Sequence, residues 1–400
     1  MSTEVLDTEV AYSPERVFRA CARVALEHRW ALAAWSLPRS SDWQVLLSTA
    51  TERSAAVEIL DGTEPGFYLH PFSPDSERPG RFLPADVVYN SFHRDFQTRG
   101  RTPETERVLD AVQTAVNTST GAEPEFYTQT LRSTVHARNQ KDLYVRWVSQ
   151  AVRTIRETDL EKVVLARTYL TMDEVHPIPF FLTLRKLYPH AFISLISTPQ
   201  TGTWIGASPE LLMAVNDIHQ FRTVSLAGTE PVTEDRRPVS WTGKEFEEQE
   251  IVSRYILRRI RSIGIGQVHV EGPYTHQAGN VYHLRTDITG SLQSPGKRVQ
   301  PSELVSILHP TPAVCGRPQK LALDFIRETE PFQRRFYAGF LGPVGFQGET
   351  QLYVNLRCLQ LLDDLAVVYA GAGITSESDP EAEWAETTLK CETLLRGLHV

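Results

Sequence analysis

The chain has 400 residues, 41% of them hydrophobic, and a formal net charge of −8 at pH 7. This length suits one large α+β domain or two smaller ones, and the acidic balance argues against a nucleic-acid-binding protein, which needs a basic surface. Four cysteines without a CxxC pair, an N-terminus without a signal-peptide pattern and the lack of a long apolar run predict a cytoplasmic protein that does not bind a membrane, with a monomer as the default state.

The first part of the chain, to about residue 135, is punctuated by proline and glycine, with strands expected at 43–48 and 55–60. A connector at 118–126 leads to a helix predicted at about 139–158. Alternation then predicts strands at 162–169, 191–197, 203–206, 211–215, 219–226, 282–289, 340–346, 351–359 and 361–369. Further helices are predicted at about 244–262 and from residue 380. Short turns between adjacent strands favour an antiparallel α+β fold over a doubly wound parallel sheet, and we expect 1–400 to be a single large domain.

The helix predicted at 244–262 carries two glutamates on its apolar face. At about 100° per residue, Glu245 and Glu248 fall in the same sector as Val252 and Ile256. A buried carboxylate is unfavourable unless a cation meets it. Mg²⁺ is such a cation, because one or two carboxylates hold it together with an anionic substrate.

The last helix contains a second acidic pair, Glu383 and Glu386, which are three residues apart and share a face. They could bind the same ion. The alternative is that they are solvated, because Glu386 and Lys390 have the spacing of an ordinary surface ion pair. Glu383 also follows Asp379-Pro380, a helix start at which acidic residues complement the helix dipole.

Common catalytic motifs are missing from the sequence, which contains neither GxxxxGK[ST] nor GxSxG. The histidines show no zinc-binding spacing. Gly371-Ala-Gly373 is similar to the start of a dinucleotide-binding loop, but the third glycine is absent.

Several short motifs follow one another between about residues 136 and 400. They are Lys162-Val-Val-Leu-Ala-Arg167, Gly206-Ala-Ser-Pro-Glu210, Leu226-Ala-Gly-Thr229, Lys244-Glu-Phe-Glu-Glu248, His309-Pro-Thr-Pro-Ala-Val-Cys-Gly316, Tyr353-Val-Asn-Leu-Arg357, Gly371-Ala-Gly-Ile374 and Glu383 to Lys390. In this order they resemble the chorismate-utilising enzymes, and most of all the isochorismate synthases. The first 135 residues carry no comparable signal. We therefore expect a variable N-terminal part at 1–135 and a chorismate-binding catalytic core at 136–400.

The resemblance implies large antiparallel β-sheets flanked by helices, with the active site between them. It also implies an Mg²⁺-dependent reaction in which water adds at C2 of chorismate and the C4 hydroxyl leaves. In this reaction Lys162 would be the base that activates the water, and Glu210 the acid that protonates the leaving hydroxyl. Lys162 shares its strand face with Val164 and Ala166, and the apolar flanks of Glu210 would raise its pKa. Without the resemblance, the two would be interpreted as a surface lysine and a polar turn residue.

The resemblance also implies metal and substrate contacts. Glu248 and Glu386 correspond to direct magnesium ligands, and Glu245 and Glu383 to carboxylates that hold metal-bound water. The expected substrate contacts are Gly228, Thr229, His283, Ala313, Arg357, Gly371, Gly373 and Lys390. Among them, Arg357 and Lys390 would bind substrate carboxylates, and the two glycines would present backbone N–H groups ahead of a helix N-terminus. The alternative for His283 is a satisfied core histidine.

Individual residues favour isochorismate synthase within the family. Lys162 favours water over ammonia as the nucleophile, and Ala227 stands where aminodeoxychorismate synthases carry a lysine. Ala313 differs from the threonine typical of salicylate synthases, which form isochorismate and then eliminate pyruvate. That activity remains an alternative, as does an inactive chorismate-binding homologue. Gln249 replaces the histidine that many members have after the metal glutamate. Isochorismate feeds menaquinone, siderophore and salicylate synthesis, and the sequence does not select among them.

Overall fold

The computed structural model describes residues 2–4, 12–49, 52–73, 79–100, 102–118, 123–130, 140–231, 240–278, 281–294 and 296–399. Within these ranges it does not describe the side chains of Ser2, Thr3, Glu4, Thr229, Pro231, Lys244, Glu248, Ala278, Val281, Ser294 and Thr393. Two of the predicted site residues, Thr229 and Glu248, therefore have side chains that lie outside the described part.

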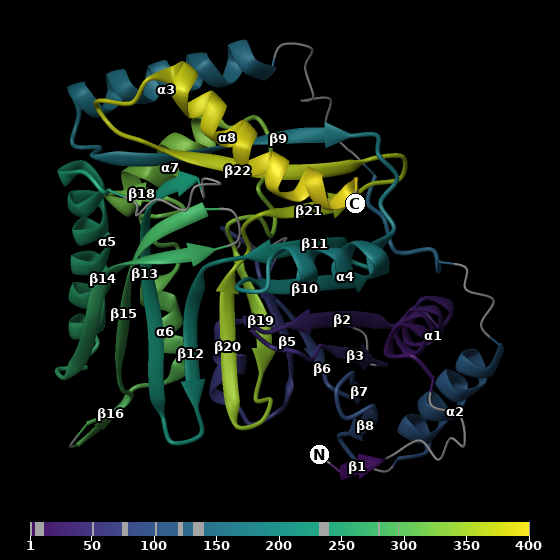
Figure 1. The fold of residues 1–400 in the computed structure, drawn as a ribbon. Helices are drawn as coiled ribbons and strands as arrows, with labels where there is room; N and C mark the ends of the chain where they lie inside the picture. Colours follow the sequence, from purple (N-terminus) through teal and green to yellow (C-terminus); the bar gives the residue numbers. More distant parts are fainter. Residues whose placement is uncertain are drawn as a thin grey trace.

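Two antiparallel sheets form the centre of the molecule (Figure 1). In the described part of the chain, the first sheet has 11 strands in the order β1 (Ser2–Glu4), β8 (Asp95–Thr98), β7 (Val87–Asn90), β3 (Gln44–Ser48), β2 (Ala31–Ser36), β10 (Phe192–Thr198), β11 (Gly202–Ser208), β21 (Cys358–Leu361), β22 (Ala366–Ile374), β9 (Lys162–Thr171) and β18 (Gly316–Arg317). The second has nine described strands in the order β14 (Val268–Ala278), β15 (Val281–Ser291), β13 (Gln220–Pro231), β12 (Leu211–Asn216), β20 (Glu349–Val354), β19 (Phe340–Val344), β5 (Gly66–His70), β6 (Arg81–Pro84) and β4 (Arg53–Ser54). A short hairpin pairs β16 (Gln293–Ser294) with β17 (Lys297–Arg298). The predicted antiparallel α+β class is confirmed.

Helices cover the sheets on their outer faces. The first sheet is covered by α1 (Pro14–Glu27), α2 (Pro103–Thr118), α4 (Pro177–Leu187) and α8 (Pro380–Leu395). The second sheet is covered by α5 (Gly243–Ser262) and α6 (Pro301–Leu308), while α7 (Gln319–Thr329) lies beside β9 and β18. The helix α3 (Gln140–Glu157) packs on α8, and two 3₁₀ turns complete the described elements, η1 (Val57–Asp61) and η2 (Arg396–Leu398). The helices predicted at 139–158, 244–262 and from 380 are confirmed.

Apolar side chains from both sheets fill the space between them. Phe192 of β10 stacks on Tyr353 of β20, with ring centroids 4.1 Å apart, and Trp35 of β2 contacts Phe67 of β5. These rings belong to one buried cluster. Because burial of a side chain of this size contributes about 1.5–3 kcal/mol, this layer holds the sheets together.

Two connections carry the chain between the sheets side by side. Glu210 lies in the link from β11 of the first sheet to β12 of the second, and Arg357 lies in the return link from β20 to β21. The strands on each side of the links are paired, β11 with β21 and β12 with β20. Backbone hydrogen bonds join the links themselves, since Val354 N–H donates to the Glu210 carbonyl and Ala207 N–H donates to the Arg357 carbonyl, both at 3.0 Å. The fold therefore places Glu210 and Arg357 on neighbouring segments.

The structure corrects three strand predictions. The strand predicted at 351–359 is interrupted after Val354, because Arg357 adopts a left-handed φ of 47° where the chain changes sheets. The strand predicted at 361–369 lies later, at Ala366–Ile374. The strand predicted at 55–60 is wrong, because 57–61 is a 3₁₀ turn whose Asp61 carboxylate accepts a hydrogen bond of 2.8 Å from the Ser302 N–H of α6. This tertiary contact outweighs the β-propensity of the segment.

None of the helices in the described chain combines the length and apolar content that a bilayer span requires. All four cysteines, which are Cys21, Cys315, Cys358 and Cys391, are buried free thiols.

Candidate active site

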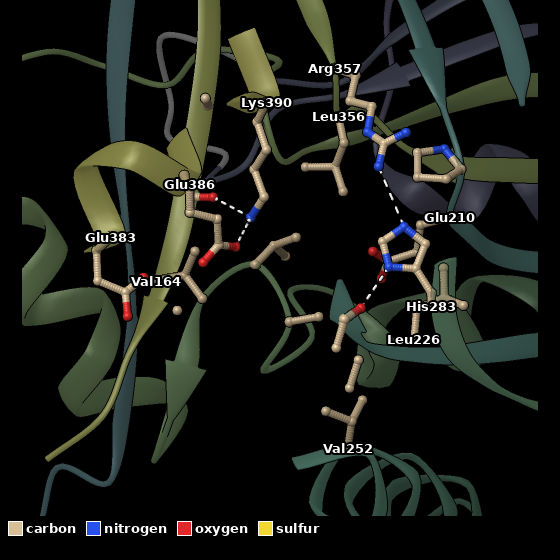
Figure 2. Close-up of a pocket in the computed structure, with 18 of the residues that line it drawn as sticks. Val164, Glu210, Leu226, Val252, His283, Leu356, Arg357, Glu383, Glu386 and Lys390 are labelled. Atoms are coloured by element: carbon tan, nitrogen blue, oxygen red, sulfur yellow. Dashed lines mark hydrogen bonds and ion pairs between the residues drawn. The ribbon is translucent and has the colours of Figure 1, made fainter. Parts of the chain in front are cut away.

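A cavity of about 310 Å³ opens beside the two links between the sheets (Figure 2). Strands β9 and β22 and helix α8 supply residues on one side, and β13, β15 and the two links supply residues on the other. Among the predicted site residues, those that line it are Lys162, Glu210, Gly228, Glu245, His283, Ala313, Arg357, Gly371, Gly373, Glu383, Glu386 and Lys390. The structure thus brings into one place the described side chains that the sequence resemblance assigned to one site.

Helix α8 supplies an acidic wall of the cavity. Asp379 begins this helix by accepting a hydrogen bond of 2.9 Å from Ala382 N–H. Glu386 pairs with Lys390 at 2.7 Å, and Lys390 also donates to the Gly371 carbonyl at 2.9 Å. The ion pair expected from the i, i+4 spacing is present, but its two side chains are half-buried and line the cavity.

The carboxyl group of Glu386 also forms a hydrogen bond with that of Glu383. Burial alone would raise the pKa of Glu386, but the Lys390 ammonium, the hydrogen bonds and the charge of Lys162 together hold it below its ordinary value. Two ionised carboxylates within hydrogen-bonding distance repel each other unless a proton or a cation lies between them. The pair therefore has the donor set that a hard divalent cation prefers.

Helix α5 contributes Glu245 to the cavity, although this side chain has a second role. Its carboxylate accepts a hydrogen bond of 2.7 Å from the backbone N–H of Thr242, which precedes the helix, and another from the Thr242 hydroxyl. Glu245 therefore caps the start of α5. Among the described side chains, no three histidine, cysteine or acidic groups are close enough to hold a metal without further ligands.

Gln249 anchors α5 on the second sheet. Its amide donates to the Thr286 hydroxyl at 2.6 Å and to the Ser225 hydroxyl at 3.3 Å, and its carbonyl accepts from Ser253 at 3.3 Å. All four residues are buried. The residue that departs from the common family pattern is therefore satisfied in full, and the first turns of α5 are fixed against β13 and β15. The predicted apolar face is confirmed, since Val252 and Ile256 are buried beside it.

Lys162 lies over the strand that carries the two predicted glycines. Gly371 and Gly373 lie ahead of α8, as expected, but inside β22, where they pair with Ala166 and Val164 of β9. A Cβ atom at Gly373 would lie 2.8 Å from Lys162 Cε. The glycine therefore leaves the space that the lysine side chain occupies at the half-buried edge of the cavity.

Glu210 is buried at the link between β11 and β12. Its side chain is 7% exposed, and burial raises its pKa to about 7. The predicted rise in pKa is confirmed, and it has the predicted cause, the loss of solvation of a carboxylate in apolar surroundings. Near neutral pH this carboxyl group is partly protonated, so that it can donate a proton.

Arg357 and His283 form the wall opposite α8 (Figure 2). The His283 Nδ1–H donates to the Gly228 carbonyl at 2.7 Å, and its Nε2 accepts from Arg357 Nη2 at 3.4 Å. Burial, together with the Arg357 charge, lowers the pKa of His283 to about 3, so the ring is neutral. Burial lowers the pKa of Arg357 to about 10, and no carboxylate of the described chain forms an ion pair with it. A carboxylate of a ligand would complete this guanidinium.

Apolar residues of the cavity were not predicted from sequence. The rings of Tyr337 and Tyr369 stack with centroids 5.4 Å apart, and both line the cavity with Val164, Leu226 and other residues. The sequence could have predicted one of them, because Tyr369 stands two residues before Gly371 and thus on the same face of its strand. The apolar surface suits a ring that carries charges at its edges.

A buried ion pair was also not predicted from the sequence. Arg334 pairs with Glu330 and donates to the carbonyls of Val164 at 2.6 Å and Val314 at 2.9 Å, while Glu330 accepts from Ala166 N–H at 2.7 Å. The two side chains thereby satisfy backbone groups of β9, the Val164 carbonyl and the Ala166 N–H, that a neighbouring strand would otherwise pair with. The ion pair thus holds the strand of Lys162 beside the segment that carries Ala313.

Comparisons with known proteins point to one family. The family model described as "Chorismate binding enzyme" matches residues 92–399. The isochorismate synthase DhbC of Bacillus subtilis is 34% identical over 274 residues, which cover 64% of this chain and 68% of that protein. The isochorismate synthase MenF of Bacillus subtilis is 29% identical over 98% of this chain and 85% of its own length. The solved structure of MenF, the menaquinone-specific isochorismate synthase from Escherichia coli, superposes with a TM-score of 0.77 at 23% identity and covers 99% of this chain and 93% of its own.

The raised pKa of Glu210 predicts a pH-dependent stability. The Glu210 carboxyl ionises near its ordinary pKa of 4.5 in the unfolded chain and near 7 in the folded chain. Its contribution to the free energy of unfolding is therefore complete below pH 4.5 and is lost as the pH rises to 7. In urea unfolding, Glu210→Gln should lack this loss of about 3 kcal/mol. It should match the wild type at pH 4.5 and exceed it at pH 8. The exposed Glu58→Gln is the control, and equal pH profiles for wild type and Glu210→Gln would contradict the burial of this charge.

Proposed function

The chain belongs to the chorismate-binding enzyme family, and from this premise we propose that it is an isochorismate synthase, an isomerase that converts chorismate to isochorismate with Mg²⁺. The observation that carries the proposal is the joint placement of Lys162 and Glu210 in the cavity that also contains the α8 carboxylates and Arg357. The names of the relatives support the activity. The assignment of base and acid rests on the resemblance together with the environments of the two groups.

The substrate would bind through its negative charges and its ring. Arg357, which is buried without an ion-pair partner in the described chain, would take one carboxylate, and Lys390 would contact the other. Tyr337 and Tyr369 supply the apolar surface against the ring. Ala313 borders the same space, in which a larger residue would reduce the room for the substrate.

The magnesium would be held at the α8 wall. The hydrogen-bonded carboxyl groups of Glu386 and Glu383 fit a hard cation, and Glu245 lines the same cavity from α5. Glu248 joins them by resemblance. When bound, Mg²⁺ neutralises the substrate carboxylate beside it. The ion pair between Lys390 and Glu386 keeps the Glu386 carboxylate ionised for this role.

Two proton transfers complete the proposed reaction. Lys162 takes a proton from the water whose oxygen forms the new bond to C2, and Glu210 gives a proton to the hydroxyl that leaves from C4 as water. One water enters and one leaves, so the product is an isomer of the substrate. Glu210 is buried away from bulk water, whereas Lys162 lies at the half-buried edge of the cavity.

The reaction is tested by incubation of the purified protein with chorismate and Mg²⁺, followed by chromatography. Isochorismate should accumulate toward a partial equilibrium, and EDTA should stop its formation. Salicylate with pyruvate would instead identify a salicylate synthase. Unchanged chorismate, with or without ammonium, would identify an inactive chorismate-binding homologue and refute the proposal.

The role of Lys162 is tested with two variants. Lys162→Ala should abolish isochorismate formation, because the base is removed. Gly373→Ala should lower kcat at least tenfold, because its new methyl group displaces the lysine side chain. Neither change should alter the midpoint of thermal unfolding by more than a few degrees, since the methyl group meets only the end of a flexible chain.

The matched control is Gly266→Ala, where a Cβ atom meets nothing within 4 Å. This variant should keep the kcat of the wild type. Near wild-type turnover of Lys162→Ala would show that another group is the base. Full activity of Gly373→Ala would show that the lysine does not act from the position in which the structure places it.

A further inference from the structure

Arg167 ends the Lys162–Arg167 motif, and nothing in the proposed reaction uses it. The residue lies on β9 and is 4% exposed. Its Nε donates to the Thr387 hydroxyl at 2.8 Å, its Nη2 donates to the Thr388 hydroxyl at 2.9 Å, and its guanidinium carbon lies 3.8 Å from the centre of the Trp384 ring. All three partners belong to α8. Within the described chain, no carboxylate pairs with it, and burial lowers its pKa.

A buried cation without a carboxylate is unfavourable compared with an apolar side chain of the same size. What the guanidinium adds is direction, because its planar fork fixes two hydroxyl groups and one ring face at the same time. The two hydroxyls are themselves tied to the helix, since Thr387 and Thr388 donate to the Trp384 carbonyl at 2.8 and 3.0 Å. Arg167 therefore contacts a rigid piece of α8 and not a loose side chain.

The contacted residues alternate with residues of the cavity. Trp384 directly follows Glu383, and Thr387 directly follows Glu386. At about 100° per residue, the side chains held by Arg167 lie on the face of α8 next to the face that carries the cavity residues. A glutamate carboxylate lies about 6 Å from the helix axis, so a rotation of about 10° moves it by about 1 Å. A displacement of that size in an active site can cost about 100-fold in rate.

We propose that Arg167 is a positioning residue that sets the rotation of α8 and thereby the positions of Glu383, Glu386 and Lys390. Its effect on α8 is independent of the reaction, whereas its effect on Mg²⁺ affinity and turnover rests on the proposed function. Arg167 connects the strand that carries Lys162 with the helix that carries the acidic pair. Arg167 thus adds a direct contact between the strand of Lys162 and α8, beside the packing of α8 on β22 and the hydrogen bond from Lys390 to the Gly371 carbonyl.

The test compares Arg167→Lys and Arg167→Met with the wild type in two measurements. Hydrogen–deuterium exchange without Mg²⁺ reports on α8 itself, and amides of residues 383–390 should exchange at least tenfold faster in both variants. Calorimetric titration with Mg²⁺ in the presence of chorismate should show at least tenfold weaker binding. Arg167→Lys keeps the positive charge but loses the planar fork of hydrogen-bond donors. Faster exchange and weaker Mg²⁺ binding in this variant would therefore show that the fork is required in addition to the charge.

Paired threonine variants keep the test informative if an Arg167 variant fails to fold. Thr387→Val removes the hydroxyl that Arg167 contacts and should weaken Mg²⁺ binding severalfold, whereas Thr387→Ser keeps the hydroxyl and should behave like the wild type. The control for loss of a partly buried arginine is Arg185→Lys on α4. Burial also lowers the pKa of Arg185, which donates to the Ser41 carbonyl and does not line the cavity. This variant should leave Mg²⁺ affinity and α8 exchange unchanged.

Unchanged exchange over 383–390 in Arg167→Lys and Arg167→Met would overturn the proposal, whatever the activity of the protein. Equal Mg²⁺ affinity of Thr387→Val and Thr387→Ser would also overturn it. A wild-type protein that neither binds Mg²⁺ nor forms isochorismate would instead refute the proposed function. In that case the exchange measurement still decides whether Arg167 holds α8.

Discussion

Burial of charge without a counter-charge is the constraint on which this site depends. Glu210 and Arg357 lie on adjacent links between the two sheets. Burial favours the neutral form of each, because it raises the pKa of Glu210 to about 7 and lowers that of Arg357 to about 10. A folded chain keeps such groups only where the rest of the structure stabilises them in place. The paired strands β11–β21 and β12–β20 do so, because they fix both links from two sheets at once. The result is a partly protonated carboxyl group and a guanidinium without an ion-pair partner in the described chain, and both line one cavity.

The α8 wall of the cavity carries negative charge that is only partly compensated. Glu383 and Glu386 approach each other on α8, and Lys390 satisfies only part of their charge. An anionic substrate alone would add repulsion there, and a divalent cation alone would leave Arg357 without a carboxylate. A cation and an anionic substrate that bind together would satisfy both walls. We therefore expect joint binding in a cavity that Tyr337 and Tyr369 also line, and at whose edge Gly373 leaves the space that the Lys162 side chain occupies.

Much of this arrangement could be predicted from sequence, because it depends on local pattern. The two acidic helices, the apolar environment of Glu210 and the antiparallel class follow from periodicity and composition, and the resemblance grouped the residues that line the cavity. What could not be predicted depends on contacts between distant segments. The sequence around Arg357 has continuous strand character, and only pairing with two different sheets breaks it there. The spacing of Glu386 and Lys390 is the same on an open surface and beside a cavity, and the double role of Glu245 requires knowledge of where α5 begins. The anchoring contacts of Arg167, Gln249 and Arg334 join segments far apart in the chain and leave no local signal.

The proposed function requires that one cavity binds Mg²⁺ and a dianionic substrate as a pair. By thermodynamic linkage, each ligand must then strengthen the binding of the other by the same factor. Isothermal titration of Mg²⁺ should therefore show at least tenfold tighter binding at saturating chorismate than without it, and titration of chorismate should show the same factor with Mg²⁺. Equal Mg²⁺ affinities in the presence and absence of chorismate would show that the two ligands do not bind as a pair.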